Sequence, residues 1–350
     1  MTNSTVTDNV LITGGAGFIG SHFVHKLLKE TDYNAVVVDS LSYAGVLDNL
    51  KYLFDTERFY FINADITDRD AMRSVLGLYQ PRAIINFAAE SHVDRSIDDP
   101  SPFIHTNYKG TFELLEAARI MLQECSKYVR DRFTFIQIST DEVYGSKHRG
   151  KSTETDVLNP SSVYSASKAA ADHLALSYHK TFGMNTIVTR SSNNYGPNQL
   201  VEKFIPTVIL NTMESTKIPI YGNGANERDW IYVGDNCNAL LNVMYNGKAG
   251  EIYNIGTGRS ISNLTIVDTI LAIMQKKTYN VDGLVEFVKD RPGHDLRYCL
   301  NVNKINKLAW KAHTRLDVGL RKTIEWYIDN PEWINTVTKA GNNRRRLGVQ

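Results

Sequence analysis

The first half of the chain alternates short apolar runs with longer amphipathic stretches. The apolar runs span residues 10–13, 35–39, 59–63, 83–88, 133–139 and 186–190. Their hydrophobicity is continuous, which is typical of strands that are covered on both faces, as in a parallel sheet with crossover helices. Because such crossovers are right-handed, the simplest arrangement is a doubly wound α/β sheet.

Beyond Asn193 this rhythm breaks. Pieces rich in Asn, Gly and Asp are separated by a few helical stretches, and they predict a smaller, mixed C-terminal region that binds the substrate. We therefore predict a dinucleotide-binding domain over 1–190, a substrate-binding domain over 191–335 and a basic tail over 336–350. The segment 229–245 could return to the first domain, which leaves the boundary soft.

Composition narrows the class of protein without naming a function. The chain of 350 residues is 42% hydrophobic and 22% charged with a formal net charge of +1, so neither a nucleic acid nor a membrane is an expected partner. Its three cysteines match no metal-ligand spacing, so we expect reduced thiols and no bound metal. The polar N-terminus and the lack of a bilayer-length apolar run predict a cytoplasmic protein.

A glycine-rich turn lies between the first predicted strand and the helix that follows it. Gly14, Gly17 and Gly20 would permit a tight turn, the approach of a pyrophosphate and close helix–strand packing. An ordinary strand–helix turn is the alternative. The next strand ends in Asp39, at the spacing expected of a carboxylate that binds a ribose 2′-hydroxyl, and its charge would repel a 2′-phosphate. The pattern therefore predicts NAD rather than NADP as cofactor.

Asp65 and Ile66 follow the third predicted strand and are candidate contacts to the adenine edge of such a cofactor. A simple turn after the strand explains an aspartate at this place equally well. Propensity alone does not separate the two explanations.

Tyr164 and Lys168 are four residues apart in a stretch with a helical pattern, so their side chains share one helix face. A free tyrosine titrates near pH ~10, which is too high for a base at neutral pH. A lysine ammonium one turn away and a positively charged nicotinamide ring would lower the pKa of the phenol. The spacing alone occurs by chance in many helices. The glycine loop and the acidic pair described next strengthen the prediction that Tyr164 and Lys168 are catalytic.

An acidic pair follows the fifth predicted strand. The last residue of this strand, Ser139, is followed directly by Thr140, Asp141 and Glu142. In an open α/β sheet, residues just beyond the carboxyl end of a strand face the crevice that binds the ligand. Two neighbouring acids in a partly dry cleft repel, so one pKa rises and one residue can stay protonated while the other acts as a base. A helix N-cap with acids in the first turn is the alternative. Thr140 could also bond a sugar hydroxyl alongside Tyr164.

Six motifs carry a resemblance to a known family. They are TGGAGFIGSH, FAAESHVDRSI, ISTDEVYG, YSASKAAADH, RSSNNYGP and DRPGHDLRY, and they run from the first strand to about residue 300. With them the chain resembles the dTDP-glucose 4,6-dehydratases, among the extended short-chain dehydrogenases/reductases. The Asp–Glu pair distinguishes this family from the nucleotide-sugar 4-epimerases that it otherwise resembles. Membership implies a modified Rossmann domain, tightly held NAD and a homodimer built on two helices, here about 102–124 and 162–182.

The resemblance also implies a mechanism on named residues. Tyr164, activated by Lys168 and helped by Thr140, removes the proton of the glucose 4-hydroxyl while hydride passes from carbon 4 to NAD. The resulting ketone acidifies the carbon-5 proton, which Glu142 removes, and protonated Asp141 donates to the departing 6-hydroxyl. Hydride then returns to carbon 6, which gives a 4-keto-6-deoxy sugar and regenerates NAD.

The same resemblance assigns binding residues. The implied cofactor contacts are Gly14, Gly17, Phe18, Ile19, Gly20, Asp39, Asp65, Ile66, Ala88, Ala89, Ser139, Tyr164 and Lys168. The implied substrate residues are Ser91 and Asn107, which contact the sugar or order the site, Asn193, Arg228 and Arg291 at the diphosphate, and Lys203 and Tyr221 near the nucleoside. Arginine suits the diphosphate through its bidentate fork, although a surface ion pair is the alternative for each.

Two rival functions stay open at this point. A 4-epimerase shares NAD, Tyr164 and Lys168 but has no need of the acidic pair, and a non-catalytic NAD-binding protein of this fold would need none of these residues. The base of the substrate is open too, since thymine and uracil differ by one methyl group, worth ~1–3 kcal/mol in a pocket. The predicted substrate is therefore dTDP-glucose or UDP-glucose, and the product is expected to feed the synthesis of 6-deoxyhexoses such as rhamnose.

Overall fold

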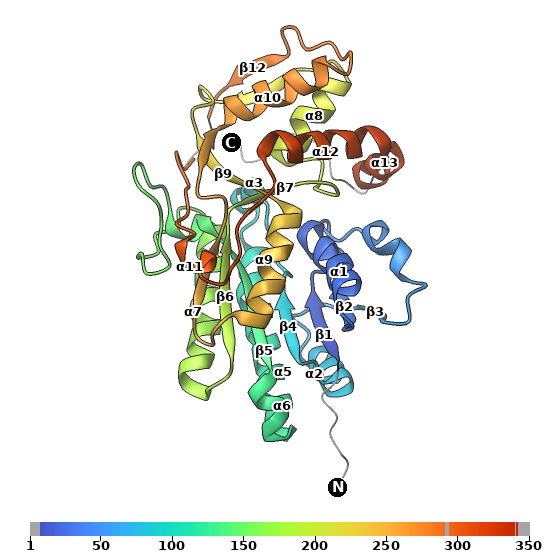
Figure 1. Ribbon diagram of the computed structural model, residues 1–350, viewed down its shortest axis with the longest axis vertical. Coiled ribbons are helices and arrows are strands. Elements are labelled where there is room, and N and C mark those ends of the chain that lie inside the picture. Colours follow the sequence, from blue (N-terminus) through green and yellow to red (C-terminus); the bar gives the residue numbers. More distant parts are fainter. Residues whose placement is uncertain (1–7, 291–293, 340, 342–350) are drawn as a thin grey trace.

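The computed structural model describes residues 8–290, 294–339 and 341. Its largest element is a seven-stranded sheet with the strand order β10-β6-β5-β4-β1-β2-β3, and every pair of neighbouring strands in it is parallel (Figure 1). The strands are β1 (Asn9–Thr13), β2 (Asn34–Asp39), β3 (Phe59–Asn63), β4 (Ala83–Asn86), β5 (Thr134–Thr140), β6 (Thr186–Ser191) and β10 (Ile252–Ile255). The predicted doubly wound sheet is confirmed, and all six apolar runs of the sequence form strands in it.

Both faces of this sheet are covered, because successive residues of a strand point to opposite sides. On one side Ile12 of β1 packs in a buried cluster with Leu27 and Leu240. On the other side Leu11 packs with Met72 and Leu114. The helices that supply these residues are α1 (Phe18–Glu30) and α9 (Val233–Asn246) on the first face, and α2 (Arg69–Tyr79), α5 (Thr111–Glu124) and α7 (Val163–Phe182) on the second. Burial on both faces is the reason that the strands are continuously apolar.

The C-terminal part adds two small sheets around a second buried cluster, at the top of Figure 1. One sheet joins β11 (Ser260–Ser262), β9 (Glu227–Tyr232) and β7 (Asn193–Tyr195), and the other joins β12 (Val285–Val288) and β8 (Ile218–Tyr221). Their helices are α8 (Phe204–Met213), α10 (Asn263–Gln275), α12 (Leu316–Asp329) and α13 (Pro331–Lys339). The smaller mixed region expected from the sequence is therefore present.

Short helices connect these layers and supply several residues of the site. They are η1 (Leu47–Leu53), α3 (Val93–Asp98), α4 (Ser101–Phe103), η2 (Ile104–Gly110), α6 (Lys127–Arg132), η3 (Asp141–Tyr144) and α11 (Asn303–Asn306). The turn η2 is π-helical, a rare conformation that is often found at functional sites.

Residues 233–255 return to the large sheet, since α9 packs with α1 in one buried cluster and β10 pairs with β6. How the chain divides into domains stays a prediction. The predicted tail begins inside α13, which ends at Lys339, and residues 340 and 342–350 lie outside the described part.

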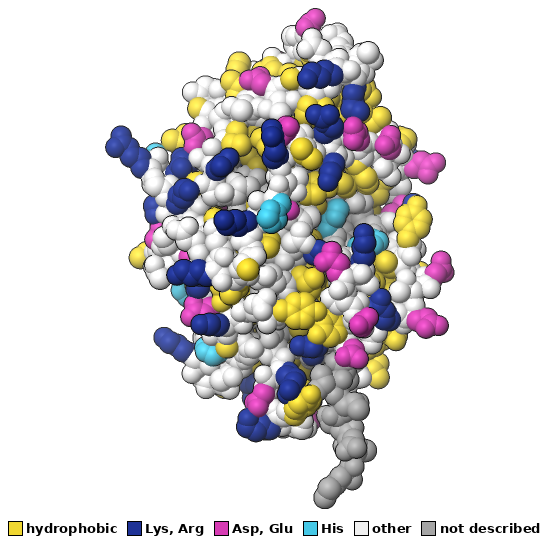
Figure 2. Space-filling view, in the orientation of Figure 1, with side chains coloured by type: hydrophobic (Ala, Val, Ile, Leu, Met, Phe, Trp, Pro, Cys, Tyr) yellow, Lys and Arg dark blue, Asp and Glu magenta, His cyan; other side chains and the backbone are white. Residues whose placement is uncertain are grey.

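The surface carries both signs of charge, with Lys and Arg more frequent on the left of the face that Figure 2 shows. Within the described residues, no helix combines the length and the apolar character that crossing a membrane requires.

A buried ion pair fastens α7 to the sheet. Arg190 Nε lies 2.9 Å from Asp172 Oδ2, and the two side chains are 2% and 0% exposed. Arg190 also donates to the hydroxyl of Tyr144, at the end of η3, and this hydroxyl donates to Asn254 of β10. The network therefore joins α7, the acidic turn η3 and two neighbouring strands at one buried point.

Removing one partner of this pair should destabilise the chain strongly. Asp172→Asn leaves the Arg190 charge buried without its counter-ion, which typically costs about 3–5 kcal/mol. The matched control is Asp131→Asn in the exposed Lys127–Asp131 pair, whose side chains are 81% and 55% exposed. That change should cost less than about 1 kcal/mol. Urea denaturation of both variants measures the difference, and equal midpoints would contradict the role given to the buried pair.

Candidate active site

The glycine loop lies against the end of β4, and two of its glycines have no room for a side chain. Gly14 has φ +65°, and a Cβ there would sit 2.7 Å from the backbone nitrogen of Ala88. A Cβ on Gly20 would sit 2.2 Å from the Gly14 carbonyl oxygen. Next to them, α1 begins at Phe18 with no side-chain cap on its first amides. These free N–H groups face the pocket that a pyrophosphate would enter.

Asp39 holds the loop in place from the end of β2. Its Oδ2 accepts a hydrogen bond of 2.9 Å from the Ala16 amide, and its Oδ1 accepts one of 2.9 Å from the Leu41 amide. Burial raises the pKa of the Asp39 carboxyl, and both hydrogen bonds oppose this rise. The carboxylate thus lines the pocket at the place where a ribose would lie.

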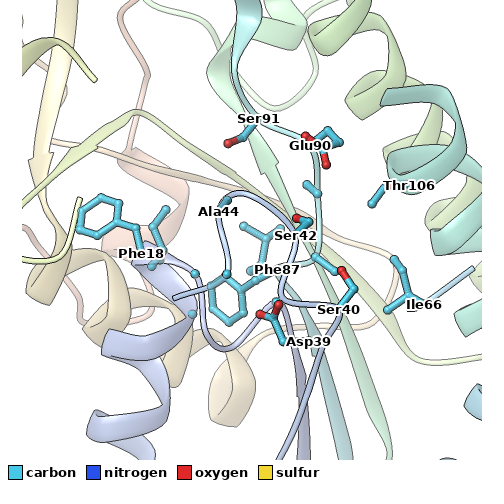
Figure 3. Close-up of a pocket in the computed structure, with 18 of the residues that line it drawn as sticks. Phe18, Asp39, Ser40, Ser42, Ala44, Ile66, Phe87, Glu90, Ser91 and Thr106 are labelled. Atoms are coloured by element: carbon cyan, nitrogen blue, oxygen red, sulfur yellow. The ribbon is translucent and has the colours of Figure 1, made fainter. Parts of the chain in front are cut away.

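One pocket gathers all of the predicted cofactor contacts. Its lining includes Gly14, Gly17, Phe18, Ile19, Gly20, Asp39, Asp65, Ile66, Ala88, Ala89, Ser139, Tyr164 and Lys168, together with Ser91 and Lys203. The sequence reading did not name Ser40, Ser42, Ala44, Gly45, Phe87, Glu90, Thr106, Gln199 and Leu200, which also line it. Figure 3 shows the loop after β2, with Asp39 and Ser42, beside the segment after β4, with Phe87 and Ser91.

Some of these missed residues had a signal in the sequence. The polar run after Asp39 continues the strand that supplies the ribose carboxylate, so its place in the cleft could have been expected. Gln199 and Leu200 lie far along the chain and carry no such signal. Gln199 Oε1 is buried and has no hydrogen-bond partner among the described residues, so it is available to a ligand.

The helix α7 presents Tyr164 and Lys168 to the same cleft. Its start is fixed by a capping box between Ser162 and Ser165. Lys168 Nζ donates a 2.6 Å hydrogen bond to the Ile138 carbonyl, and burial lowers the pKa of Lys168 to about 8.

Tyr164 is half-buried, and its ring packs edge-on against Phe103 with ring centroids 6.3 Å apart. Burial raises the pKa of Tyr164, repulsion from Glu142 adds to the rise, and a hydrogen bond with Thr140 opposes it. In the protein alone the phenol therefore keeps its proton, and additional positive charge in the cleft is needed to favour the phenolate.

The strand β5 ends at Thr140, and the acidic pair forms the start of η3. Thr140 caps this turn, because its Oγ1 accepts a 3.2 Å hydrogen bond from the Glu142 amide, and it also donates to Asp141 at 3.3 Å. The sequence offered a helix N-cap with acids in the first turn as the alternative explanation of these residues. The structure has this cap, and the cap is compatible with an acid–base role of the two acids.

Asp141 is only 2% exposed. Burial raises the pKa of Asp141 well above its usual range, and repulsion from Glu142 and from Asp229 raises it further. Its Oδ2 has no hydrogen-bond partner among the described residues. Burial and the two neighbouring carboxylates therefore favour the neutral, protonated form of Asp141.

Glu142 lines a second pocket. This pocket is lined by Val93, Ser96, Ile97, Pro100, Glu142, Ser161, Ser162, Val163, Asp295 and Tyr298. The start of α7 thus borders both pockets, with Val163 in the second and Tyr164 in the first.

The resemblance placed Ser91 and Asn107 near the sugar, but only Ser91 lines the first pocket. The Ser91 carbonyl accepts a 3.4 Å hydrogen bond from Lys203. Asn107 is 1% exposed, bonds both backbone groups of Glu90 and donates to Ser167 at 2.9 Å. Its amide is occupied inside the protein, which favours the ordering role over direct contact with the sugar.

The residues predicted for the diphosphate and nucleoside lie in the C-terminal part. Asn193, at the start of β7, has a buried Oδ1 with no partner among the described residues. Arg228 donates to the Asp295 carbonyl at 2.8 Å and lies 4.4 Å over the ring of Tyr298. Tyr221 ends β8 and contacts the ring of His294 edge-on. Arg291 falls outside the described residues.

Comparison with known proteins identifies the family of the chain. The chain matches the family model described as GDP-mannose 4,6 dehydratase over residues 11–323. It is 46% identical over 348 residues to the dTDP-glucose 4,6-dehydratase of Shigella flexneri, an alignment that covers 95% of this chain and 96% of the relative. It is 45% identical to dTDP-glucose 4,6-dehydratase 1 of Escherichia coli K12, with the same coverage.

Solved structures extend the comparison to the fold. DesIV, a dTDP-glucose 4,6-dehydratase from Streptomyces venezuelae solved with NAD bound, is 40% identical with a TM-score of 0.88 and covers 94% of this chain and 99% of its own. A UDP-glucose 4-epimerase from Thermotoga maritima is 28% identical with a TM-score of 0.83, covering 92% and 99%. The resemblance stated from the motifs is confirmed. The chain therefore belongs to the GDP-mannose 4,6 dehydratase family, and within it is similar over nearly its whole length to the dTDP-glucose 4,6-dehydratases.

Proposed function

We propose that this chain converts dTDP-glucose into its 4-keto-6-deoxy derivative, with NAD as a cofactor that is regenerated in every cycle. The observation that carries the proposal is the pair of acids after β5: burial raises the pKa of Asp141 well above its usual range, and Glu142 lines the second pocket. A dehydratase needs one acid and one base beside its oxidation site, whereas an epimerase does not. The identity of 46% to a dTDP-glucose 4,6-dehydratase supports the same conclusion.

The first pocket suits NAD. The glycine loop and the uncapped N-terminus of α1 would bind the pyrophosphate. The Asp39 carboxylate would bind a ribose, and Gln199 Oε1 offers a further polar contact. When bound, NAD supplies the redox chemistry, since it accepts a hydride from carbon 4 and returns it to carbon 6.

Tyr164 acts as the base of the oxidation. It takes the proton of the 4-hydroxyl, and the Thr140 hydroxyl that bonds it orients the phenol. Lys168, held by the Ile138 carbonyl one helical turn away, brings positive charge into the same cleft. Its pKa of about 8 leaves Lys168 largely protonated at neutral pH, so it can offset the burial of a developing phenolate.

Glu142 and Asp141 carry the elimination. Glu142 removes the carbon-5 proton after the ketone at carbon 4 has made it acidic. Asp141 donates its proton to the 6-hydroxyl, which leaves as water, and so ends the step as a carboxylate. When hydride reaches carbon 6, Glu142 returns its proton to carbon 5, and Asp141 must regain a proton from water before the next cycle.

Thymine is the proposed base of the substrate, and UDP-glucose is the nearest competitor. Asn193 and Arg228 are the proposed ligands of the diphosphate, and Lys203 and Tyr221 are proposed to lie near the nucleoside. A homodimer through helices α5 and α7, and a place in the cytoplasm, complete the proposal. The free state of Cys125, Cys237 and Cys299 fits a reducing compartment.

Mass spectrometry of the product tests the reaction directly. With dTDP-glucose and no added reductant, we expect the nucleotide sugar to lose the mass of one water. A parallel incubation with UDP-glucose should be slower by roughly the 5- to 150-fold that one methyl group can provide. A product of unchanged mass that yields galactose on hydrolysis would replace this proposal with the 4-epimerase.

Amide variants of the acidic pair separate oxidation from elimination. Asp141→Asn and Glu142→Gln should each lower the formation of dehydrated product by about 10²–10⁴-fold, since each removes one acid–base group. Oxidation should still occur, so absorbance of reduced nicotinamide should build up after substrate is added. Asp131→Asn, on the exposed side of α6, is the control and should behave like the wild type. Full dehydration by both amide variants would count against the assignment.

The proton on Asp141 also predicts a pH dependence of stability. Because the pKa of Asp141 is raised in the folded chain, the folded state holds this proton at pH values where the unfolded state, with a pKa of about 4, has lost it. Stability therefore falls as pH rises through this window. Asp141→Asn cannot ionise, so we expect it to be more stable than the wild type near neutral pH. Urea denaturation at about pH 5 and about pH 8 tests this, and an Asn variant less stable at both would refute it.

A further inference from the structure

Three segments that are distant in sequence meet beside the cofactor cleft, around the side chain of Asn49. They are the glycine loop, the segment 196–203 that follows β7, and the C-terminal helices α12 and α13. Figure 1 shows α13 above α1, although the two helices lie near opposite ends of the described chain. Asn49 lies in η1 and is 7% exposed.

Asn49 holds the glycine loop with its amide nitrogen. Nδ2 donates a 2.9 Å hydrogen bond to the Ala16 carbonyl, which also accepts one of 3.0 Å from the Val46 amide. The amide of the same Ala16 is bound by Asp39, so both backbone groups of this residue are fixed. A substitution at Asn49 would therefore affect the glycine loop through Ala16.

The amide oxygen of Asn49 faces the other way and joins two further segments. It accepts a 2.9 Å hydrogen bond from Asn198 Nδ2 and a 2.8 Å hydrogen bond from Trp333 Nε1 of α13. Asn198 has φ +62°, a left-handed backbone that is uncommon outside glycine. Its side-chain bond to Asn49 helps to hold the turn of the 196–203 segment in this conformation.

The 196–203 segment is itself a wall of the cofactor pocket, to which it contributes Gln199, Leu200 and Lys203. It is fastened at two more points. His22 Nε2 of α1 lies 2.9 Å from the Pro197 carbonyl, and the Tyr327 hydroxyl of α12 donates to the Gln199 carbonyl. The wall is thus bonded to α1, to η1 and to the C-terminal helix pair.

We propose that α12 and α13 act as a latch that keeps the 196–203 wall closed over bound NAD, with Asn49, Trp333 and Tyr327 as its positioning residues. The proposal rests on the NAD site proposed above. A redox-neutral cycle does not require the cofactor to leave, so a wall that opens rarely is compatible with turnover. For NAD to escape, the wall has to move, and these hydrogen bonds have to break first.

Two conservative variants test the latch in the NAD-bound enzyme. Trp333→Phe keeps an aromatic ring in the core but removes the donor to Asn49, and Tyr327→Phe removes the donor to the Gln199 carbonyl. The control is Trp326→Phe, whose ring packs edge-on against Trp333 at 4.9 Å and which leaves the Trp333–Asn49 bond in place. The measured quantity is the rate at which enzyme loaded with radiolabelled NAD loses label after a chase with excess unlabelled NAD.

Each latch variant should release NAD roughly 2- to 13-fold faster than the wild type, the range that the net free energy of one hydrogen bond allows. The double variant should be faster than either single one. The control should stay within about twofold of the wild type, and all variants should dehydrate substrate at the wild-type rate when NAD is saturating. Hydrogen exchange of residues 196–203 should rise in the latch variants and not in the control.

Three outcomes would overturn the latch. In the first, both latch variants release NAD at the wild-type rate. In the second, Trp326→Phe accelerates release as much as Trp333→Phe, which would show general loosening of the helix pair. In the third, the wild type binds no NAD, and then the proposed cofactor site fails as well. Only the first two leave the dehydratase proposal untouched, so the two failures are distinguishable.

Discussion

A carboxylic acid buried beside a second carboxylate is the constraint around which this site is built. Ionising Asp141 would place a charge in a dry site next to Glu142 and Asp229, so the pKa of this group is raised and its protonated form is favoured. A protonated acid is useful to an elimination only if it stays where the leaving group will be. The Thr140 cap fixes the start of its turn, and the Arg190–Tyr144 contact fixes the end. Thr140 takes part in both, because it caps η3 and also donates a hydrogen bond to Asp141.

The parallel sheet brings the two halves of the chemistry together. The acidic turn follows β5 directly, while Tyr164 and Lys168 come from α7, which leads into the neighbouring strand β6. Lys168 contacts the Ile138 carbonyl of β5 itself. Asp172, one turn beyond Lys168, pairs with Arg190 of β6. Oxidation and elimination thus share one rigid frame of two strands and a helix, although their residues are separated along the chain.

The parts that could be predicted from the sequence are those in which local pattern and function coincide. The six apolar runs, the glycine turn and the four-residue spacing of Tyr164 and Lys168 each encode their own geometry, and the structure places them accordingly. The capping of Thr140 was available as an alternative and is realised together with the acidic pair.

What could not be predicted depends on contacts between distant segments. Asn49 and Trp333 are 284 positions apart, and nothing in either neighbourhood indicates the other. The occupied amide of Asn107 and the backbone contacts of Arg228 are likewise decided by tertiary packing. The resemblance gave Asn107 either a sugar contact or an ordering role and placed Arg228 at the diphosphate. An amide and a guanidinium suit a ligand as well as they suit a backbone carbonyl, so residue type alone does not separate these roles.

The late return of the chain to its main sheet affects how the protein is made. The strand β6 ends at Ser191, but its outer neighbour β10 begins only at Ile252. During synthesis β6 is therefore an unpaired edge strand until the ribosome has added the intervening residues, a delay on the order of 3–13 s at about 5–20 residues per second. An open edge of this kind is a template for association with other chains. The nascent polypeptide is thus most exposed to aggregation while its C-terminal part is still being translated.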